Sequence, residues 1–164
     1  MKKVLIVVAI LLTSVCCKAQ ETITFPFQGG NAIFTRFFKD SLVVSPEIVQ
    51  KRATGTVIIK FTANYKGTVT KMIIYYTDDY ILTIPIIEAL KKSNHKWIIP
   101  DEEQVHDFII TFSINYNPPA NPDAKLARQV ADYYANRKPI LSNNQVPIDD
   151  ATLLPTVVVN YDLQ

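Results

Sequence analysis

The chain has few of the residues that cross-link small folds, bind metals or make sharp turns. Of its 164 residues only two are cysteine, two are histidine and four are glycine. Because Cys16 and Cys17 are adjacent near the amino terminus, no disulfide framework spans the chain. An excess of one charge is also missing, since 17 Lys and Arg stand against 15 Asp and Glu. A balance so close to neutral, without a basic block, indicates that nucleic acid is not a partner.

Signatures of catalysis and of metal or phosphate binding are missing as well. His95 and His106 are the only histidines, and a zinc site would need two carboxylates to join them at a suitable geometry. The carboxylates at 101–103 resemble the acid pair of a glycoside hydrolase, but adjacent residues of a loop point apart. Gly29 and Gly30 are not followed by the Gly-Lys-Ser/Thr of a phosphate loop. We therefore predict a protein that is not an enzyme, with no catalytic residue, no metal site and no cofactor.

The first residues have the parts of a secretory signal peptide. Lys2 and Lys3 form a basic start, and an apolar run follows over residues 4–17. As a helix this run reaches ~21 Å, at ~1.5 Å per residue, which is short of a ~30 Å hydrocarbon core. We therefore predict a signal peptide over 1–19, cleaved after Ala19. The mature protein is then expected to be periplasmic or associated with the outer membrane.

The two cysteines leave one alternative open. Cys16 and Cys17 end the apolar run, where a lipoprotein carries its lipid-modified cysteine, although no Gly, Ala or Ser directly precedes either of them. Cleavage after Ala19 would remove three lysines and leave 14 Lys and Arg (17 − 3) against 15 Asp and Glu. The slight basic excess of the whole chain therefore belongs to the leader.

Alternation of apolar with polar residues indicates three strands in the mature chain. Residues 55–76 predict two strands joined by a turn at 64–67. In the first of these strands Lys60 falls on the polar side, which we expect to face water. Residues 108–116 predict the third strand.

Helical spacing precedes and separates these strands. We expect Asn31 to cap a first short helix and Ser45 to cap a second, with Pro46 in its first turn. A third helix is expected to begin near Thr83, between the second and third strands. Trp97 follows that helix and is expected to lie over the core. The apolar positions expected on the buried face of the third helix are Ile84, Ile87 and Leu90.

We divide the mature chain into a domain over 20–116 and a C-terminal extension over 117–164. The Pro-rich stretch 117–122 ends the third strand and is typical of a semi-rigid spacer. Asp123 is then expected to cap a helix that runs to about Ala135. Residues 156–161 predict a short last strand at the edge of a sheet.

Several short patterns between residues 25 and 116 occur in an order that one known family shows. The stretch 27–30, Phe-Gln-Gly-Gly, loosely matches that family's opening Phe-Pro-Gly-Gly. The hairpin carries Gly-x-Val at 55–57 and again at 67–69. A Lys-Trp at 96–97 and a closing Ile-x-Phe at 110–112 follow. Through these patterns residues 25–116 resemble the C-terminal domain of TonB-type energy transducers, in the form common in Bacteroidetes.

The resemblance implies a fold and a way of binding. The fold would be α+β, with a three-stranded antiparallel sheet, helices packed on one face, and a helix and short strand added by the extension. The partner would be a segment of an outer-membrane TonB-dependent receptor, or of another envelope protein, added as a strand to an open sheet edge. A homodimer formed through sheet edges is a further open alternative. The candidate edge comprises Phe108, Ile109, Ile110, Thr111, Phe112, Ser113 and Ile114.

Two functions remain open at this point. The first is an exported protein-interaction module, because the family's long Pro-rich spacer is missing. About eight residues separate Cys17 from Phe25, which reach roughly 28 Å at ~3.5 Å each and argue against force transmission. The second is a component of TonB-dependent energy transduction and transport, held at the membrane through its N-terminal segment. A further open alternative is that the strand at 156–161 occupies the candidate edge and closes it.

Overall fold

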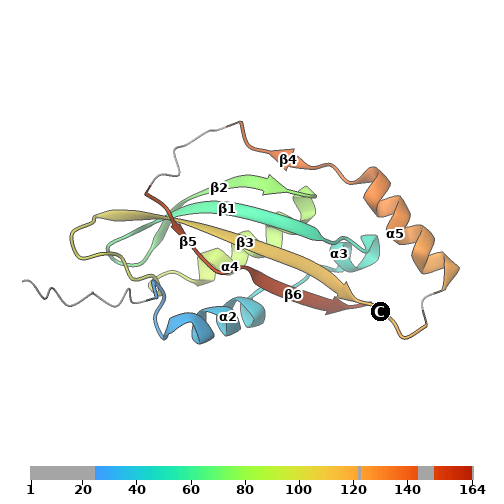
Figure 1. The fold of residues 1–164 in the computed structure, drawn as a ribbon, viewed down its shortest axis with the longest axis horizontal. Coiled ribbons are helices and arrows are strands. Elements are labelled where there is room, and N and C mark those ends of the chain that lie inside the picture. Colours follow the sequence, from blue (N-terminus) through green and yellow to red (C-terminus); the bar gives the residue numbers. More distant parts are fainter. Residues whose placement is uncertain (1–24, 122, 144–149, 164) are drawn as a thin grey trace, which may run out of the picture.

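The computed structural model describes residues 25–121, 123–143 and 150–163. The predicted signal peptide and both cysteines lie outside these residues. Figure 1 shows an α+β fold in which one curved sheet carries helices. Within the described residues no helix is both long enough and apolar enough to cross a membrane. The helices are α2 (Gly30–Ser41), α3 (Pro46–Lys51), the 3-10 turn η2 (Tyr80–Leu82), α4 (Thr83–Lys92) and α5 (Ala124–Asn136).

The sheet has six strands in the described residues, which corrects the expected three-stranded sheet. Its order is β4-β2-β1-β3-β5, and β6 also pairs with β3. The three expected strands are β1, β2 and β3, and the extension supplies the other three. β4 pairs antiparallel with β2, whereas β5 and β6 run parallel to β3, so the sheet is mixed. The strands are β1 (Gly55–Asn64), β2 (Val69–Thr77), β3 (Val105–Asn117), β4 (Ile140–Leu141), β5 (Thr152–Leu153) and β6 (Val157–Asp162).

The β1–β2 hairpin is confirmed, and its turn is fixed by a side chain and a glycine. The Asn64 side-chain oxygen accepts from the backbone N–H groups of Lys66, at 3.0 Å, and Thr68, at 3.1 Å. Gly67 has a φ of 71°, and a Cβ there would lie 2.6 Å from the Trp97 backbone oxygen. The turn therefore requires glycine at this position because both the angle and the space exclude a side chain.

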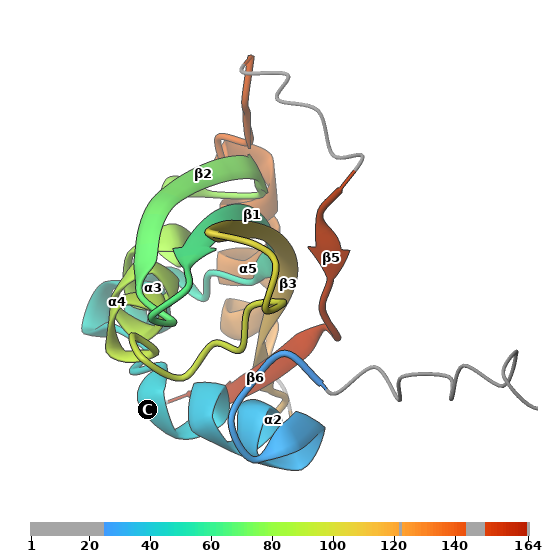
Figure 2. The same cartoon turned by 90° about the vertical axis from the view of Figure 1, so that its left-hand side faces the viewer.

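One face of the sheet carries the core. Alternate β1 residues are almost completely buried on this face. Figure 2 shows α4 inside the curve formed by β1, β2 and β3, and α2 beside β6. Trp97 is 3% exposed, and its ring lies 4.6 Å from that of Phe61 and 5.1 Å from that of Phe27, measured between centroids. The expected position of Trp97 over the core is confirmed.

α4 begins at Thr83 as expected, but the cap of α2 and the buried face of α4 differ from the expectation. α2 begins after Gly29, which has a φ of 86°, so Asn31 lies inside the helix and does not cap it. In α4 the predicted buried face is wrong at Ile84, which is 47% exposed, while Ile86 is buried. The η2 turn precedes α4, and the Asp79 side chain caps it. The buried side chains of α4 are Thr83, Pro85, Ile86, Ala89 and Leu90, so Leu90 lies on the core face as expected and Ile84 does not.

Other helix starts follow the sequence. The Ser45 hydroxyl accepts from the backbone N–H of Ile48 at 3.4 Å, as a cap of α3. The Asp123 carboxylate accepts from the N–H of Leu126 at 2.7 Å, as the cap of α5. Both expected caps are confirmed, because a side-chain acceptor at this position satisfies a backbone donor that the helix leaves free.

Lys60 corrects the expectation of a wet strand face. Its side chain is only 4% exposed, and its ammonium group lies 2.7 Å from the Asp107 carboxylate across the β1–β3 pair. The Thr62 hydroxyl donates to the other oxygen of Asp107, at 2.5 Å. A buried lysine is tolerated here because a carboxylate on the neighbouring strand balances its charge.

Candidate partner-binding edge

The candidate edge does not lie open. On one side β3 pairs with β1 over ten residues, from Gly55↔Ile114 to Asn64↔Val105, with no register shift. On the other side β5 pairs with residues 108 and 109, and β6 pairs with residues 112–117. Among the described residues, only Ile110 and Thr111 of the candidate edge have no strand partner on that side. The arrangement observed is the alternative in which the C-terminal strand closes the edge.

The break between β5 and β6 has a simple cause. The N–H of Leu154 donates to the Ile109 backbone oxygen at 2.8 Å, which ends the β5 pairing. Pro155 follows and has no N–H group to offer to the ladder. The chain therefore leaves β3 for a few residues and returns at Val157. We call residues 150–163 the tail.

β6 inserts alternate side chains into the core. Val157, Val159 and Tyr161 are 0%, 7% and 7% exposed, whereas Val158 between them is 45% exposed. Fully burying an aliphatic side chain of this kind stabilises a fold by roughly 1.5–3 kcal/mol. The tail is thus held by several kcal/mol of apolar burial in addition to its backbone hydrogen bonds.

Tyr161 adds a specific polar contact to this burial. Its hydroxyl donates to the Ala53 backbone oxygen at 2.9 Å. Ala53 lies two residues before the start of β1, so the contact links the tail to the beginning of the hairpin. Burial raises the pKa of Tyr161 to about 12, because the charged tyrosinate would be desolvated.

Polar contacts also fix both ends of the tail. At one end His106 bridges two partners, with Nδ1 2.6 Å from the Glu103 carboxylate and Nε2 2.7 Å from the Thr152 hydroxyl. At the other end the Asn117 amide donates to the Asp162 carboxylate at 2.7 Å. His106 therefore connects the start of β3 to β5. In the described part of the chain no group of three or more His, Cys, Asp and Glu side chains is placed to hold a metal ion.

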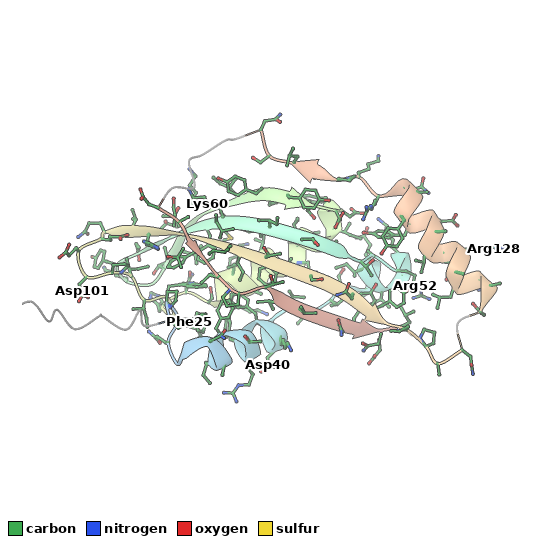
Figure 3. The ribbon with its side chains drawn as sticks, in the orientation of Figure 1. Phe25, Asp40, Arg52, Lys60, Asp101 and Arg128 are labelled. Carbon is green, nitrogen blue, oxygen red and sulfur yellow. The ribbon has the colours of Figure 1, made fainter. Side chains whose placement is uncertain are left out.

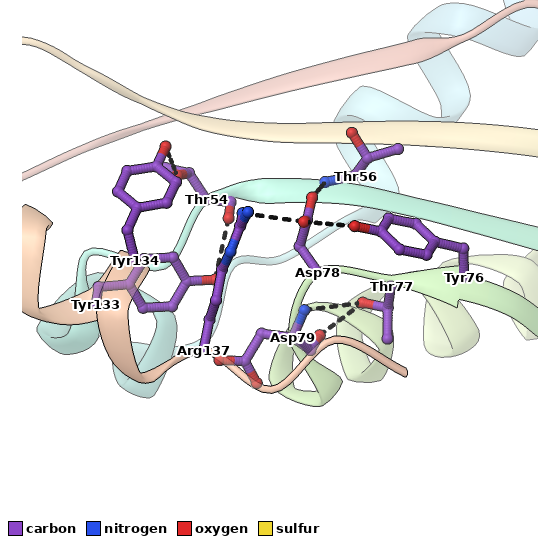
Figure 4. A network of polar contacts seen from close by, with 9 residues as sticks. All are labelled: Thr54, Thr56, Tyr76, Thr77, Asp78, Asp79, Tyr133, Tyr134 and Arg137. Atoms are coloured by element: carbon purple, nitrogen blue, oxygen red, sulfur yellow. Dashed lines mark hydrogen bonds and ion pairs between the residues drawn. The ribbon is translucent and has the colours of Figure 1, made fainter. Parts of the chain in front are cut away.

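A second network attaches α5 to the other end of the hairpin (Figure 4). The Tyr133 hydroxyl donates to the Thr54 backbone oxygen at 3.0 Å, and the Tyr134 hydroxyl lies 2.9 Å from the Thr54 hydroxyl. Arg137 at the end of α5 pairs with Asp78 at 2.9 Å. Asp78 is only 8% exposed. This carboxylate therefore holds the extension to the end of β2.

Asp78 has further partners that the sequence does not reveal. It accepts from the Thr56 N–H and from the Tyr76 hydroxyl, each at 2.7 Å. The sequence suggests only a helix cap or turn residue at 78–79, a role that Asp79 fills. The sequence does not reveal the ion pair of Asp78 with Arg137, because Arg137 is almost sixty positions away along the chain. Only the folding of α5 brings the two side chains together.

The opposite edge of the sheet is organised differently. β4 pairs with β2 only at Tyr76 and Thr77, and Ser142 donates its N–H to the Tyr75 oxygen. In the described structure no strand lies outside residues 70–74. Lys71 is exposed there, and the β1–β2 register shifts on both sides of this stretch. Lysines and bulges are common devices that keep an edge strand from pairing with another chain.

Charge on β3 is arranged around Asp107. Partial burial would raise the pKa of this carboxyl, but hydrogen bonds from Lys60 and Thr62 outweigh burial and leave the pKa below its usual value. The carboxylate therefore stays ionised and keeps the Lys60 pair intact at neutral pH.

Comparison of the chain with protein-family models, curated proteins and solved structures gave no match. The resemblance to the TonB C-terminal domain therefore remains an interpretation of the residue patterns described above.

Proposed function

We propose that the mature chain is a protein-interaction module of the cell envelope that binds an extended segment of another envelope protein by strand addition. The resemblance indicates a TonB-dependent outer-membrane receptor as the class of partner. The observation that carries the proposal is the outer side of β3, which takes two added parallel strands from the tail. An edge that accepts a strand of its own chain has the backbone geometry to accept one from a partner.

Binding at β3 requires that the partner segment replace the tail. The partner must therefore offer a similar pattern, with apolar side chains at alternate positions where Val157, Val159 and Tyr161 now lie. Its apparent affinity is reduced by the small fraction of molecules in which the tail is released. The β2 edge is the weaker candidate for strand addition because Lys71 and two register shifts protect it.

A reversible lock on the tail tests the proposal. Ser113 and Val158 are register partners on adjacent parallel strands. Neighbouring strands lie about 4.8 Å apart, which is within the range of Cα–Cα distances that a disulfide spans, so the double variant Ser113→Cys with Val158→Cys is suited to a disulfide. Residues 20–164 contain no other cysteine, which makes this bond the sole disulfide of the mature variant. The oxidised and reduced forms are used as baits in an envelope extract of the organism that produces the protein.

We expect the reduced variant to capture a TonB-dependent receptor and the oxidised variant to lose that capture by about tenfold or more. The single variant Ser113→Cys is the control, and oxidant should not change its capture. Equal capture by locked and unlocked forms would show that β3 is not the binding edge. Recovery of inner-membrane motor proteins in place of a receptor would favour the energy-transduction component instead.

A further inference from the structure

Two backbone oxygens, one in α3 and one in the turn after it, lie at the hydroxyl of Tyr161 under the end of the tail. The hydroxyl donates to the Ala53 oxygen at 2.9 Å and lies 3.5 Å from the Ile48 oxygen. The Ile48 oxygen also accepts from the Ala53 N–H at 3.0 Å, so it keeps a donor when the tail is absent. The Ala53 oxygen is therefore the acceptor for which the tyrosine hydroxyl matters.

The turn that carries the Ala53 oxygen is shaped by contacts within α3 and its cap. Arg52 ends α3 with a left-handed backbone, at a φ of 55°, and its N–H donates to the Val49 oxygen at 3.2 Å. Its side chain adds a second hydrogen bond, from Nη1 to the same oxygen at 2.7 Å. Figure 3 shows Arg52 at the end of the sheet where β6 finishes, near α5. Since these contacts do not involve the tail, we expect the Ala53 oxygen to keep its direction when the tail is released.

The surroundings of this oxygen favour a neutral hydrogen-bond donor. Ala53 is 0% exposed and Tyr161 is 7% exposed, so water does not replace the hydroxyl while a strand lies here. A carboxylate in this place would face two acceptor oxygens and be repelled. Burial raises the pKa of Tyr161, whereas the nearby positive charge of Arg52 lowers it, and the same charge disfavours a cation. Phenylalanine is disfavoured as well, because it leaves a buried acceptor without a donor.

Length and spacing restrict the donor further. Tyr161 pairs in register with Tyr116 of β3, and the centroids of their rings lie 6.4 Å apart. The hydroxyl reaches the Ala53 oxygen from the far end of its ring, a length that the short side chains of serine and threonine do not span. Val157 and Val159 are buried at the two preceding alternate positions. This side of β3 thus accepts two aliphatic side chains and then a long, neutral donor.

We infer that the Ala53 oxygen forms a tyrosine-selecting subsite at the end of the β3 edge. The partner segment then runs parallel to β3 and presents two aliphatic side chains followed by a tyrosine, each two positions apart. The inference rests on the proposed function, because the partner takes the place of the tail. A segment with phenylalanine at the third position covers the Ala53 oxygen without giving it a donor, so it binds more weakly. The subsite therefore adds selection for one polar group to the selection for alternating apolar side chains.

Three labelled peptides test the subsite on the full mature chain. The parent peptide has the sequence of residues 156–163, Thr-Val-Val-Val-Asn-Tyr-Asp-Leu. The second has phenylalanine in place of the tyrosine, and the third has 4-methylphenylalanine, which is close to tyrosine in size but has no hydroxyl. Binding is measured by fluorescence anisotropy with the variant Val159→Ala, whose own tail is held less tightly. The tail lowers the apparent affinity of all three peptides by the same factor, so the ratio of their affinities reports on the subsite.

We expect the tyrosine peptide to bind about tenfold or more tightly than either of the other two, because a site built around a hydroxyl rejects the analogue without it. A peptide with alanine in place of its asparagine is the matched control, since Asn160 is exposed in the tail and should not affect binding. Trp97 fluorescence checks that Val159→Ala is folded. The wild-type mature chain at higher peptide concentrations gives the same ratio as a second measurement.

The outcomes separate this inference from the proposed function. Equal affinities for the tyrosine and 4-methylphenylalanine peptides would overturn the tyrosine selection and leave strand addition at β3 standing. Failure of all three peptides to bind would overturn strand addition itself, and the subsite with it. The oxidised Ser113→Cys, Val158→Cys variant shows where the peptides bind, because the locked tail should abolish binding of the tyrosine peptide. Undiminished binding to the locked form would place the peptide away from β3 and contradict the inference.

Discussion

Tyr161 and Lys60 show how single polar side chains are accommodated in this core. The Tyr161 hydroxyl donates to the Ala53 oxygen at 2.9 Å. Lys60 is buried between strands and is balanced by Asp107, with 2.7 Å between the charged groups. In both cases a buried polar group is tolerated because a partner on another element satisfies it. The stability of the fold should therefore depend on each of these two contacts. It should also depend on pH, because Tyr161 and Asp107 can titrate.

We expect Tyr161→Phe to lower the free energy of unfolding by about 1–2 kcal/mol, because the Ala53 oxygen loses its donor inside the core. Urea unfolding followed by circular dichroism measures the change. Tyr65→Phe is the matched control, since Tyr65 is 61% exposed and should change stability little. A loss of equal size in both variants would contradict a special role for the Tyr161 hydroxyl.

The pKa of Tyr161 predicts a loss of stability in alkali. The folded pKa is raised to about 12 by burial, above an unfolded value of roughly 10. The stabilisation that the protonated Tyr161 hydroxyl gives to the fold is therefore complete below about pH 10. It is lost as the pH rises towards about 12. Stability of the wild type should fall more steeply over this interval than that of Tyr161→Phe. Parallel slopes for the two proteins would contradict the assignment.

The lowered pKa of Asp107 predicts the opposite behaviour in acid. The stabilisation that the ionised Asp107 carboxylate gives to the fold is complete above the unfolded pKa of about 3.9. It is lost as the pH falls through the lower pKa of the folded protein. At neutral pH we expect Asp107→Asn to cost about 1–3 kcal/mol, because the buried Lys60 loses a charged hydrogen-bond partner. Urea unfolding at a series of pH values checks both statements. The variant should lose less stability than the wild type between neutral and acidic pH.

At the scale of elements, the two edges of the sheet are treated in different ways. β3 is paired without a register shift to β1 and is covered on its other side by the tail. β2 keeps an outer side with an exposed lysine and shifted register. The tail contributes three alternate residues to the core, so its removal would uncover apolar surface as well as backbone groups. The contribution of each tail residue to the free energy of unfolding can therefore be measured by single substitutions.

Adjacent valines of β6 give a matched pair for this purpose. Val159→Ala is expected to destabilise the protein by roughly 1–3 kcal/mol, because it leaves a cavity under the tail. Val158→Ala removes the same atoms from a side chain that is 45% exposed and should cost about 0.5 kcal/mol or less. Hydrogen exchange of the β6 amides should also become faster in the first variant. Equal costs in both variants would contradict the observed alternation.

For the whole molecule, the core joins parts that the sequence separates. Leu154, Val157 and Tyr161 of the tail belong to the same buried cluster as Phe61 and Trp97. Tyr133 of α5 belongs to it as well. The extension therefore contributes to one shared core with residues 27–116.

A shared core predicts a single unfolding transition. Trp97 is the only tryptophan of the chain and reports on the hairpin side of the core. A fluorophore on Val158→Cys reports on the tail from an exposed position. The two signals should have the same urea midpoint, because neither part keeps its apolar burial without the other. A lower midpoint for the tail signal would instead show that the tail unfolds as a separate unit.

The sequence by itself predicted the elements whose signals are local. The β1–β2 hairpin follows from alternation and an Asn-x-x-Gly turn, and the caps at Ser45 and Asp123 follow from their side chains. Local signals failed at Asn31, which lies inside α2, and at Ile84, which lies on the exposed face of α4. A short last strand at the edge of a sheet was also expected over 156–161, and β6 occupies this stretch beside β3.

Only the tertiary structure decided how the edge of the sheet is completed. The pairing of Phe112 with Val157 joins residues 45 positions apart (157 − 112), and nothing local distinguishes it from an open edge. β4 and β5 have two residues each, too few to show a period. The burial of Lys60 and the role of Asp78 depend on partners from other elements, Asp107 and Arg137. Periodicity records which face of an element is apolar, whereas closure of an edge and neutralisation of a buried charge depend on which distant segment folds against it.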